Sequence, residues 1–196
     1  HIRVLGFAPN YGNSWLYMFG WMNNATYLSE DGTRCLLNEE RVVEALQFMV
    51  DIYDDAGGYQ SVLAYQAGFQ GGALDPFITG KVAMRIDGYF YMPHLAQFGR
   101  DLNFGVAPPP VSERMIQETG ETHVSWSGGW SYAIPINALH QEAAWEFIRF
   151  MKSERALKIM QESEREAVEA QGRLFIPTQN PIRDFNNWLI EHYILS

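Results

Sequence analysis

Near the middle of the chain stands Gly80-Lys81-Val82-Ala83-Met84-Arg85-Ile86-Asp87-Gly88, a run in which apolar and polar residues alternate. The apolar side chains Val82, Met84 and Ile86 fall on one face of an extended chain, which predicts a strand that stops at Asp87-Gly88. Working outward, short strands are also expected over 3–7, 102–107, 131–136 and 175–178. Helical patterns separate these segments. The alternation favours an α/β fold class built in layers.

The clearest helix is expected over residues 38–56, between an N-cap at Asn38 and the stop at Gly57-Gly58. Its apolar stripe is formed by Val42, Val43, Leu46, Met49, Val50 and Tyr53. Residues 14–22 are apolar nearly all round and predict a buried helix capped by Ser14. Two more helices are expected over 138–151 and after a cap at Ser153. Helix spacing places Phe48, Trp145, Phe147 and Phe150 in the core.

Length and composition bound the class of protein. With 196 residues, the chain is one large domain or one and a half. Its 14 basic and 23 acidic residues give a net charge of −9, which disfavours nucleic-acid and anionic membrane partners. The single cysteine, Cys35, excludes an internal disulfide and a thiol-rich metal site. We expect Cys35 to be buried at the start of a strand.

The motifs of common catalytic sites are missing from the sequence. It has neither a phosphate-binding Gly-x4-Gly-Lys-Ser/Thr loop nor a Gly-x-Ser-x-Gly nucleophile elbow. The five histidines are scattered without metal-ligand spacing. We therefore predict no catalytic residue, no metal site and no cofactor. Asp87 is the best single acidic candidate, because it ends a strand, although such an Asp more often forms a turn.

Aromatic residues make up 14% of the chain, and many lie at loop ends beside Gly, Asn or Ser. They are Tyr11 and Trp15 in the first loop, Tyr89 and Phe90 after Asp87-Gly88, and Trp126 and Trp130 around Gly128-Gly129. Sugars bind to this mixture, since their C–H faces stack on rings and polar groups satisfy their hydroxyls. An aromatic-rich core remains the alternative.

Seven short motifs occur in a recognisable order. They are Gly6-Phe7-Ala8-Pro9-Asn10, Trp15, Glu44-Ala45-Leu46, the run from Pro76-Phe77 to Asp87-Gly88, Phe104-Gly105-Val106-Ala107-Pro108, Trp126-Ser127-Gly128-Gly129 and Ala143-Ala144-Trp145-Glu146-Phe147. Together they cover about residues 2–180. In this order they resemble the extracellular solute-binding proteins of carbohydrate ABC importers, family 1, the maltose-binding-protein-like group.

The resemblance implies a periplasmic-binding-protein-like (type II) fold, with three-layer α/β lobes that close on a ligand by a hinge. It assigns residues 1–124 to most of the C-terminal lobe and 125–137 to a return crossing strand or hinge. Residues 138–196 then belong to helices of the other lobe, which is partial here. On this interpretation the first N-terminal lobe segment and the export signal lie outside this chain.

The resemblance also implies ligand-binding residues. Trp15 matches an aromatic loop at the cleft, and Trp126, Gly128 and Gly129 match a cleft-side Trp-x-Gly-Gly. Phe90 or Tyr89 stands where the family often places a stacking Trp. The full candidate set is Tyr11, Trp15, Asp87, Tyr89, Phe90, Trp126, Gly128, Gly129 and Trp130.

The function implied is non-enzymatic: a mono- or oligosaccharide is captured in an interlobe cleft and delivered to the permease. The expected partners are the carbohydrate and the transmembrane permease subunits. A membrane is met only through the permease or a lipid anchor outside this chain. The expected location is periplasmic or extracellular. The alternatives are a secreted carbohydrate-active enzyme that uses Asp87, and a carbohydrate-adhesion module.

Overall fold

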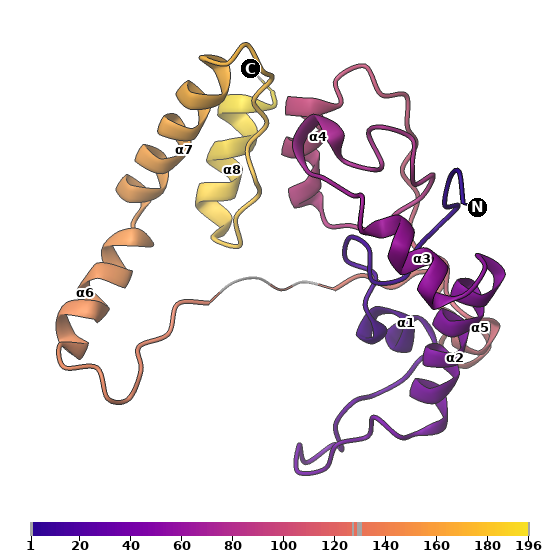
Figure 1. The fold of residues 1–196 in the computed structure, drawn as a ribbon. Helices are drawn as coiled ribbons and strands as arrows, with labels where there is room; N and C mark the ends of the chain where they lie inside the picture. The colour runs from indigo at the N-terminus through magenta and orange to yellow at the C-terminus, as the bar shows by residue number, and fades with distance from the viewer. Residues whose placement is uncertain (1, 127, 129–130, 196) are drawn as a thin grey trace. The chain divides into compact units, whose positions relative to one another are not determined.

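The computed structural model describes residues 2–126, 128 and 131–195. Its α-helices in chain order are α1 (Leu16–Met22), α2 (Glu40–Asp55), α3 (Tyr59–Gln66), α4 (Met92–Phe98), α5 (Glu113–Thr119), α6 (Gln141–Met151), α7 (Glu154–Glu169) and α8 (Arg183–Tyr193) (Figure 1). Two 3-10 turns, η1 (Gly72–Leu74) and η2 (Tyr89–Tyr91), stand between α3 and α4. Within the described ranges, no helix is both long and apolar enough to cross a bilayer.

The chain divides into two compact units. The first comprises His1–Gly88 and Asp101–Ser127, and the second comprises Tyr89–Arg100 and Gly128–Ser196. Residues 89–100 thus group with residues 128–196, whereas the resemblance assigns them, with the rest of 1–124, to the C-terminal lobe. The lobe boundaries at 124 and 137 stay a prediction.

In the first unit, the expected strands at 3–7 and 80–88 pair in parallel. The backbone amide of Leu5 donates to the Lys81 carbonyl at 2.9 Å, and the Ala83 amide donates to the Leu5 carbonyl at 2.8 Å. Single parallel bridges join Leu5 to Val82 and Gly12 to Ile86, and no longer ladder forms among the described residues. Residues 102–107 and 131–136 lie in irregular chain. The α/β fold class remains a prediction.

Helix α2 begins and ends close to its predicted bounds, but its cap and its buried face differ. Glu39 is the N-cap, with extended backbone, so the expectation of Asn38 is wrong by one residue. The buried face is Val42, Ala45, Met49 and Tyr53. Val43, Leu46, Val50 and Phe48 are exposed. The small Ala45 lets α2 approach α1, where Phe19 and Met22 complete a cluster, and this contact selects the buried face.

The second unit has its core between α7 and α8, where Leu157, Phe185 and Leu189 are buried together. Ser153 caps α7 as predicted, since its Oγ accepts from the Ala156 amide at 3.3 Å. Helix α6 contributes no buried residue. The prediction that Trp145, Phe147 and Phe150 are core residues is therefore wrong for this structure, because α7 and α8 cover each other instead.

A hairpin precedes α2. Its tight turn lies at Asp31-Gly32, where the Gly32 amide donates to the Ser29 carbonyl at 2.8 Å, and an antiparallel bridge joins Leu28 to Cys35. Cys35 is exposed, so the prediction of a buried thiol is wrong. A two-segment hairpin has no second layer to cover Cys35, which explains the difference.

Candidate functional site

The candidate ligand residues are distributed over both units. Tyr11, Trp15, Asp87 and Trp126 belong to the first, and Tyr89, Phe90 and Gly128 to the second. Gly129 and Trp130 lie outside the described residues. Within the first unit, the four residues fall into two groups, one of aromatic rings that meet edge to face and one of charged side chains.

The aromatic cluster is formed by Trp15, Tyr17, Trp21 and Trp126. The Tyr17 ring is the centre: its centroid lies 5.6 Å from Trp15, 5.2 Å from Trp21 and 5.7 Å from Trp126, each edge to face. Helix α1 supplies Tyr17 and Trp21, and Trp15 is its N-cap residue. The structure thus brings two predicted ligand-binding residues, Trp15 and Trp126, into contact with the same tyrosine.

Tyr17 was missed by the sequence reasoning, although its spacing to Trp21 is that of neighbours on a helix face. Its hydroxyl donates to Asn13 Oδ1 at 3.0 Å, and burial raises the pKa of this phenol above its ordinary value. The Tyr17 ring is therefore held by the hydrogen bond of its hydroxyl to Asn13 and by contacts with three indole rings. Trp15 keeps about half of its surface exposed, at 49%. An exposed ring held in one orientation is suited to stack on a sugar.

The N-cap residue of α1 also differs from the predicted one. Ser14 is fully buried and its Oγ donates to the Tyr11 carbonyl at 2.8 Å. It therefore closes the loop, and Trp15 takes the N-cap position predicted for Ser14.

The Arg85 cluster comprises Tyr11, Asp75, Arg85 and Asp87. Arg85 Nη1 donates to the Tyr11 hydroxyl at 3.1 Å and to Asp75 Oδ2 at 3.3 Å, and Nη2 pairs with Asp87. The guanidinium also lies over the Tyr11 ring, 4.6 Å from its centroid. The side chains of Arg85, Asp75 and Asp87 are 11%, 12% and 9% exposed. One cation thus holds two nearly buried carboxylates.

This environment defines what Tyr11 and Asp87 do in the structure. Asp87 binds Arg85 with one oxygen and accepts from the Gly88 amide with the other at 2.9 Å. Burial raises the pKa of Tyr11 to about 12, while the Arg85 charge acts in the opposite direction. Both groups are engaged inside the unit, and their binding of a ligand stays a prediction. Asp75 and Arg85 were missed because charged residues give no local pattern for burial.

Gly12 joins the two groups. Its φ of +73° is in the left-handed region, and a Cβ at this position would lie 2.5 Å from the Ile86 carbonyl oxygen. The next amide, of Asn13, donates to that same oxygen at 2.7 Å. A glycine is therefore required for the first loop to reach the segment of Arg85 and Asp87. From there, Asn13 extends to Tyr17.

In the second unit, Tyr89 and Phe90 stand in η2 with ring centroids 6.4 Å apart. Both are about half exposed, and the Tyr89 hydroxyl donates to the Gln179 carbonyl at 2.6 Å. Gly128 is exposed. Within this unit, these residues form exposed aromatic surface, and their role in binding stays a prediction.

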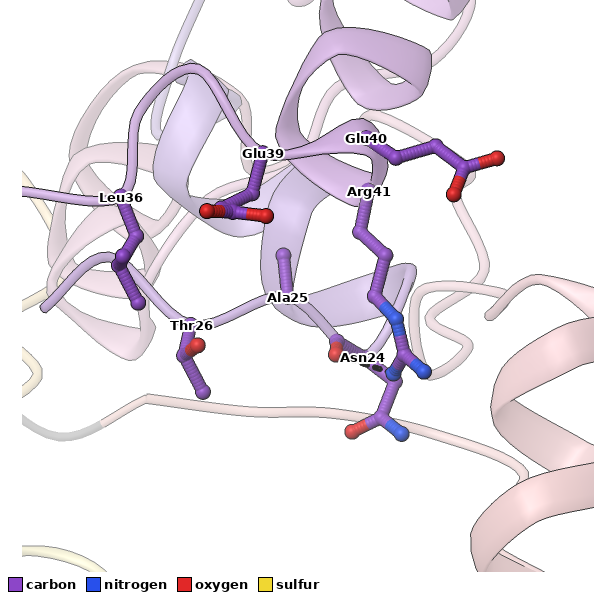
Figure 2. Close-up of a pocket in the computed structure, with 7 residues that line it drawn as sticks. All are labelled: Asn24, Ala25, Thr26, Leu36, Glu39, Glu40 and Arg41. Carbon is purple, nitrogen blue, oxygen red and sulfur yellow. Dashed lines mark hydrogen bonds between the residues drawn. The ribbon is translucent and has the colours of Figure 1, made fainter. Parts of the chain in front are cut away.

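A hollow of about 390 Å³ opens beside the start of α2 (Figure 2). It is lined by Asn24, Ala25, Thr26, Leu36, Glu39, Glu40 and Arg41. Arg41 Nη1 donates to the Asn24 carbonyl at 2.9 Å across its edge. None of the described candidate residues lines this hollow. Across the described part of the chain, no group of His, Cys, Asp and Glu side chains is arranged to hold a metal ion.

Comparison with known proteins gives one match. A family model described as bacterial extracellular solute-binding protein matches residues 3–163. The match includes both side-chain groups of the first unit and extends into α7. No curated protein and no solved structure matches the chain.

Proposed function

The chain belongs to the bacterial extracellular solute-binding proteins, and from this membership we propose that it is the sugar-binding component of an ABC importer. It captures a mono- or oligosaccharide outside the cytoplasm and presents it to the transmembrane permease subunits. The family establishes an extracellular solute-binding protein. The sugar, the permease and the periplasmic or cell-surface setting are the proposed part.

The observation that carries the proposal is the aromatic cluster. Trp15 is half exposed and contacts the Tyr17 ring edge to face, and Trp126 contacts the same ring. A pyranose needs a flat apolar surface for one face and nearby polar groups for its hydroxyls. Asn13 and the Tyr17 hydroxyl supply polar atoms at the base of the cluster. None of the four rings carries a charged group that could pair with a charged solute.

Binding without turnover fits the position of the one acid that the enzymatic alternative would use. Asp87 pairs with Arg85 through one carboxylate oxygen and accepts from the Gly88 amide with the other, so both oxygens already have partners within the unit. A general acid in glycoside hydrolysis needs a carboxyl oxygen that reaches the glycosidic oxygen of the substrate. The α-helices along the chain also fit a solute-binding protein better than a β-sandwich adhesion module.

The test is a titration of the intrinsic tryptophan fluorescence with glucose, xylose, maltose and raffinose. We expect a saturable change with at least one sugar, and roughly tenfold weaker binding in Trp15→Ala, from the lost stacking. Trp145→Ala is the matched control, because Trp145 is 55% exposed against 49% for Trp15 but lies on α6. Equal weakening in both variants contradicts the assignment of the site.

A product assay in the same samples separates binding from catalysis. We expect no cleavage of glycosidic bonds by the wild-type protein. Cleavage that disappears in Asp87→Asn would establish the enzymatic alternative and overturn the proposal. Loss of cleavage must be accompanied by an unchanged far-UV circular dichroism spectrum, since Asp87 also has a structural role.

A further inference from the structure

Residues 111–126, which we call the strap, lie over α1 and α2 within the first unit. Val111 and Val124 pack against the buried cluster of Phe19, Met22, Ala45 and Met49. The Ser112 amide donates to the Met22 carbonyl at 2.9 Å, and the Ser112 Oγ caps α5. The strap is therefore attached at its start by backbone and near its end by an apolar contact.

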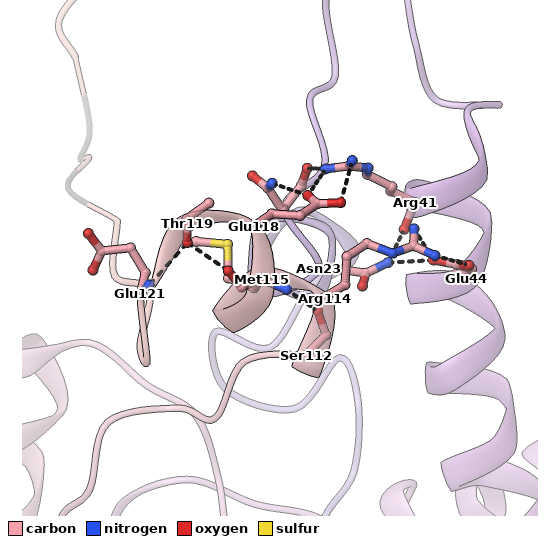
Figure 3. Close-up of polar contacts among 10 residues, drawn as sticks. Asn23, Arg41, Glu44, Ser112, Arg114, Met115, Glu118, Thr119 and Glu121 are labelled. Carbon is pink, nitrogen blue, oxygen red and sulfur yellow. Dashed lines mark hydrogen bonds and ion pairs between the residues drawn. The ribbon is translucent and has the colours of Figure 1, made fainter.

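Two crossed ion pairs attach the middle of the strap (Figure 3). Arg41 of α2 pairs with Glu118 of α5 at 2.8 Å, and Arg114 of α5 pairs with Glu44 of α2 at 2.9 Å. Each helix thus gives one cation and one anion. A reversed α5 would place like charges together, so the crossed arrangement fixes its direction. We call these four residues the latch.

The end of α1 joins the latch through two adjacent asparagines. Asn23 Nδ2 donates to Glu44 Oε2 at 2.9 Å, and Asn24 Nδ2 donates to Glu118 Oε2 at 2.6 Å. Each carboxylate therefore pairs with an arginine and also accepts from an asparagine amide. As a result, three segments distant in sequence meet at two carboxylates.

The strap ends at the aromatic cluster. After α5 the chain turns at Gly120, the Glu121 amide donates to Thr119 Oγ1 at 3.1 Å, and Trp126 follows five residues later. Its ring stands on Tyr17 with an interplanar angle of 88°. Six residues link α5 to Trp126, and Val124 within this link packs on the buried cluster, so α5 and Val124 together limit where the Trp126 ring can lie.

We propose that Arg41, Glu44, Arg114 and Glu118 are positioning residues that hold Trp126 on Tyr17, and that release of this latch opens the aromatic cluster. The geometry of the release does not depend on the ligand. That the open cluster binds sugar more weakly rests on the proposed function. The apolar contacts of Val111 and Val124 keep the strap on the unit, while the latch sets its register.

The ion pairs of the latch depend on pH. Glu44 faces Asn23, Arg114 and Arg41, and Glu118 faces Asn24, Arg41 and Arg114. The asparagine hydrogen bonds, then the arginine contacts, lower the pKa of both carboxyls below 4.5. The ion pairs are consequently complete above pH 4.5 and are lost as the pH falls through the lowered values. Acid therefore opens the latch.

The test measures tryptophan emission and its quenching by acrylamide in the ligand-free protein. We expect Glu118→Gln to shift the emission to longer wavelength and to increase quenching, because Trp126 leaves the Tyr17 ring. The same substitution in a Trp126→Phe background has no such effect. A change that persists without Trp126 overturns the proposal.

Two further variants separate positioning from general destabilisation. The double reversal Arg41→Glu with Glu118→Arg restores one ion pair with opposite polarity, and we expect it to regain most of the wild-type emission. Arg149→Gln is the control, since it removes the exposed pair of Arg149 with Glu146 on α6, at 2.7 Å, and leaves the emission unchanged. If Arg149→Gln shifts the emission as Glu118→Gln does, the latch is not specific.

A titration with the same four sugars distinguishes the two proposals. If no sugar binds but the Trp126 emission responds to Glu118→Gln and to acid, the latch stands and the proposed function fails. If a sugar binds the wild type and Glu118→Gln equally, with the same Trp126 emission, the latch inference fails and the function stands.

Discussion

The Arg85 cluster and the latch use the same chemistry in different surroundings. Each sets arginine against two carboxylates within the first unit. In the Arg85 cluster the side chains are 9% to 12% exposed, whereas those of the latch are 34% to 40% exposed. Water solvates the latch charges and barely reaches the Arg85 cluster.

This difference assigns the two groups different tasks. A nearly buried charge must keep its partner, because an uncompensated charge in the interior is strongly destabilising. An exposed pair is screened and can be opened at little cost to folding. The Arg85 cluster therefore maintains the unit, while the latch is free to set the position of one segment.

The largest expected effect comes from removing the central cation of the Arg85 cluster. Arg85→Met keeps the length of the side chain but leaves Asp75 and Asp87 as two nearly buried anions without their shared partner. We expect a loss of roughly 3–5 kcal/mol in the free energy of unfolding, measured by urea denaturation. Arg149→Met, at an exposed pair, serves as the control. Equal denaturation midpoints for the two variants would contradict the structural role of the Arg85 cluster.

Next in size is the close approach at Gly12, which brings the first loop to the Arg85 segment. Gly12→Ala adds both a strained φ and an overlap with the Ile86 carbonyl oxygen. We expect a loss of roughly 1–3 kcal/mol from backbone strain, with the overlap adding to it. Gly32→Ala is a matched control, since Gly32 has a φ of +69° with no atom within 4 Å of the new Cβ. The difference between the losses in Gly12→Ala and Gly32→Ala measures the contribution of the close approach to the Ile86 carbonyl. Equal losses would contradict that contribution.

The sequence predicted what local patterns determine. The bounds of α2 follow from turn-forming glycines at its end, and the cap of α7 follows from Ser153. The sequence predicted strands at 3–7 and 80–88 but did not show that they pair. The structure shows that they pair with each other, and in parallel. Trp15 and Trp126 were each identified, but a single sequence does not state that they share Tyr17.

What the sequence left open depends on contacts between distant residues. Helix α2 carries apolar residues on a broad arc, and only the neighbouring α1 selects Val42, Ala45 and Met49 for burial. Arg85 has the pattern of an outward residue on a strand, yet Tyr11 and Asp75, from other segments, enclose it. Likewise, Trp145 and Phe147 have core spacing but stay exposed, because spacing alone does not supply a covering element.

Opposite ends of the pH scale distinguish the two clusters. Burial raises the pKa of Tyr11 to about 12, so its contribution to stability is complete below pH 10 and is lost as the pH rises through the raised value. We expect the unfolding midpoint to fall above pH 10, and to fall less steeply in Tyr11→Phe. Tyr27 and Tyr193, whose pKa values are also raised to about 12, sustain the remaining slope. Identical slopes in the variant and the wild type would place Tyr11 outside the buried cluster.

Salt gives the smallest effect and the most direct comparison. At 1 M NaCl the Debye length is about 3 Å, so the exposed latch pairs are screened and the Arg85 cluster is not. The double variant Arg41→Gln with Arg114→Gln should lower the melting temperature slightly in low salt, and this difference should disappear at 1 M NaCl. The deficit of Arg85→Met should persist at both salt concentrations, because its side chains are nearly buried and salt screens buried pairs much less. Parallel melting curves with and without salt settle the point, since a latch deficit that survives 1 M NaCl would mean that its charges act as buried ones.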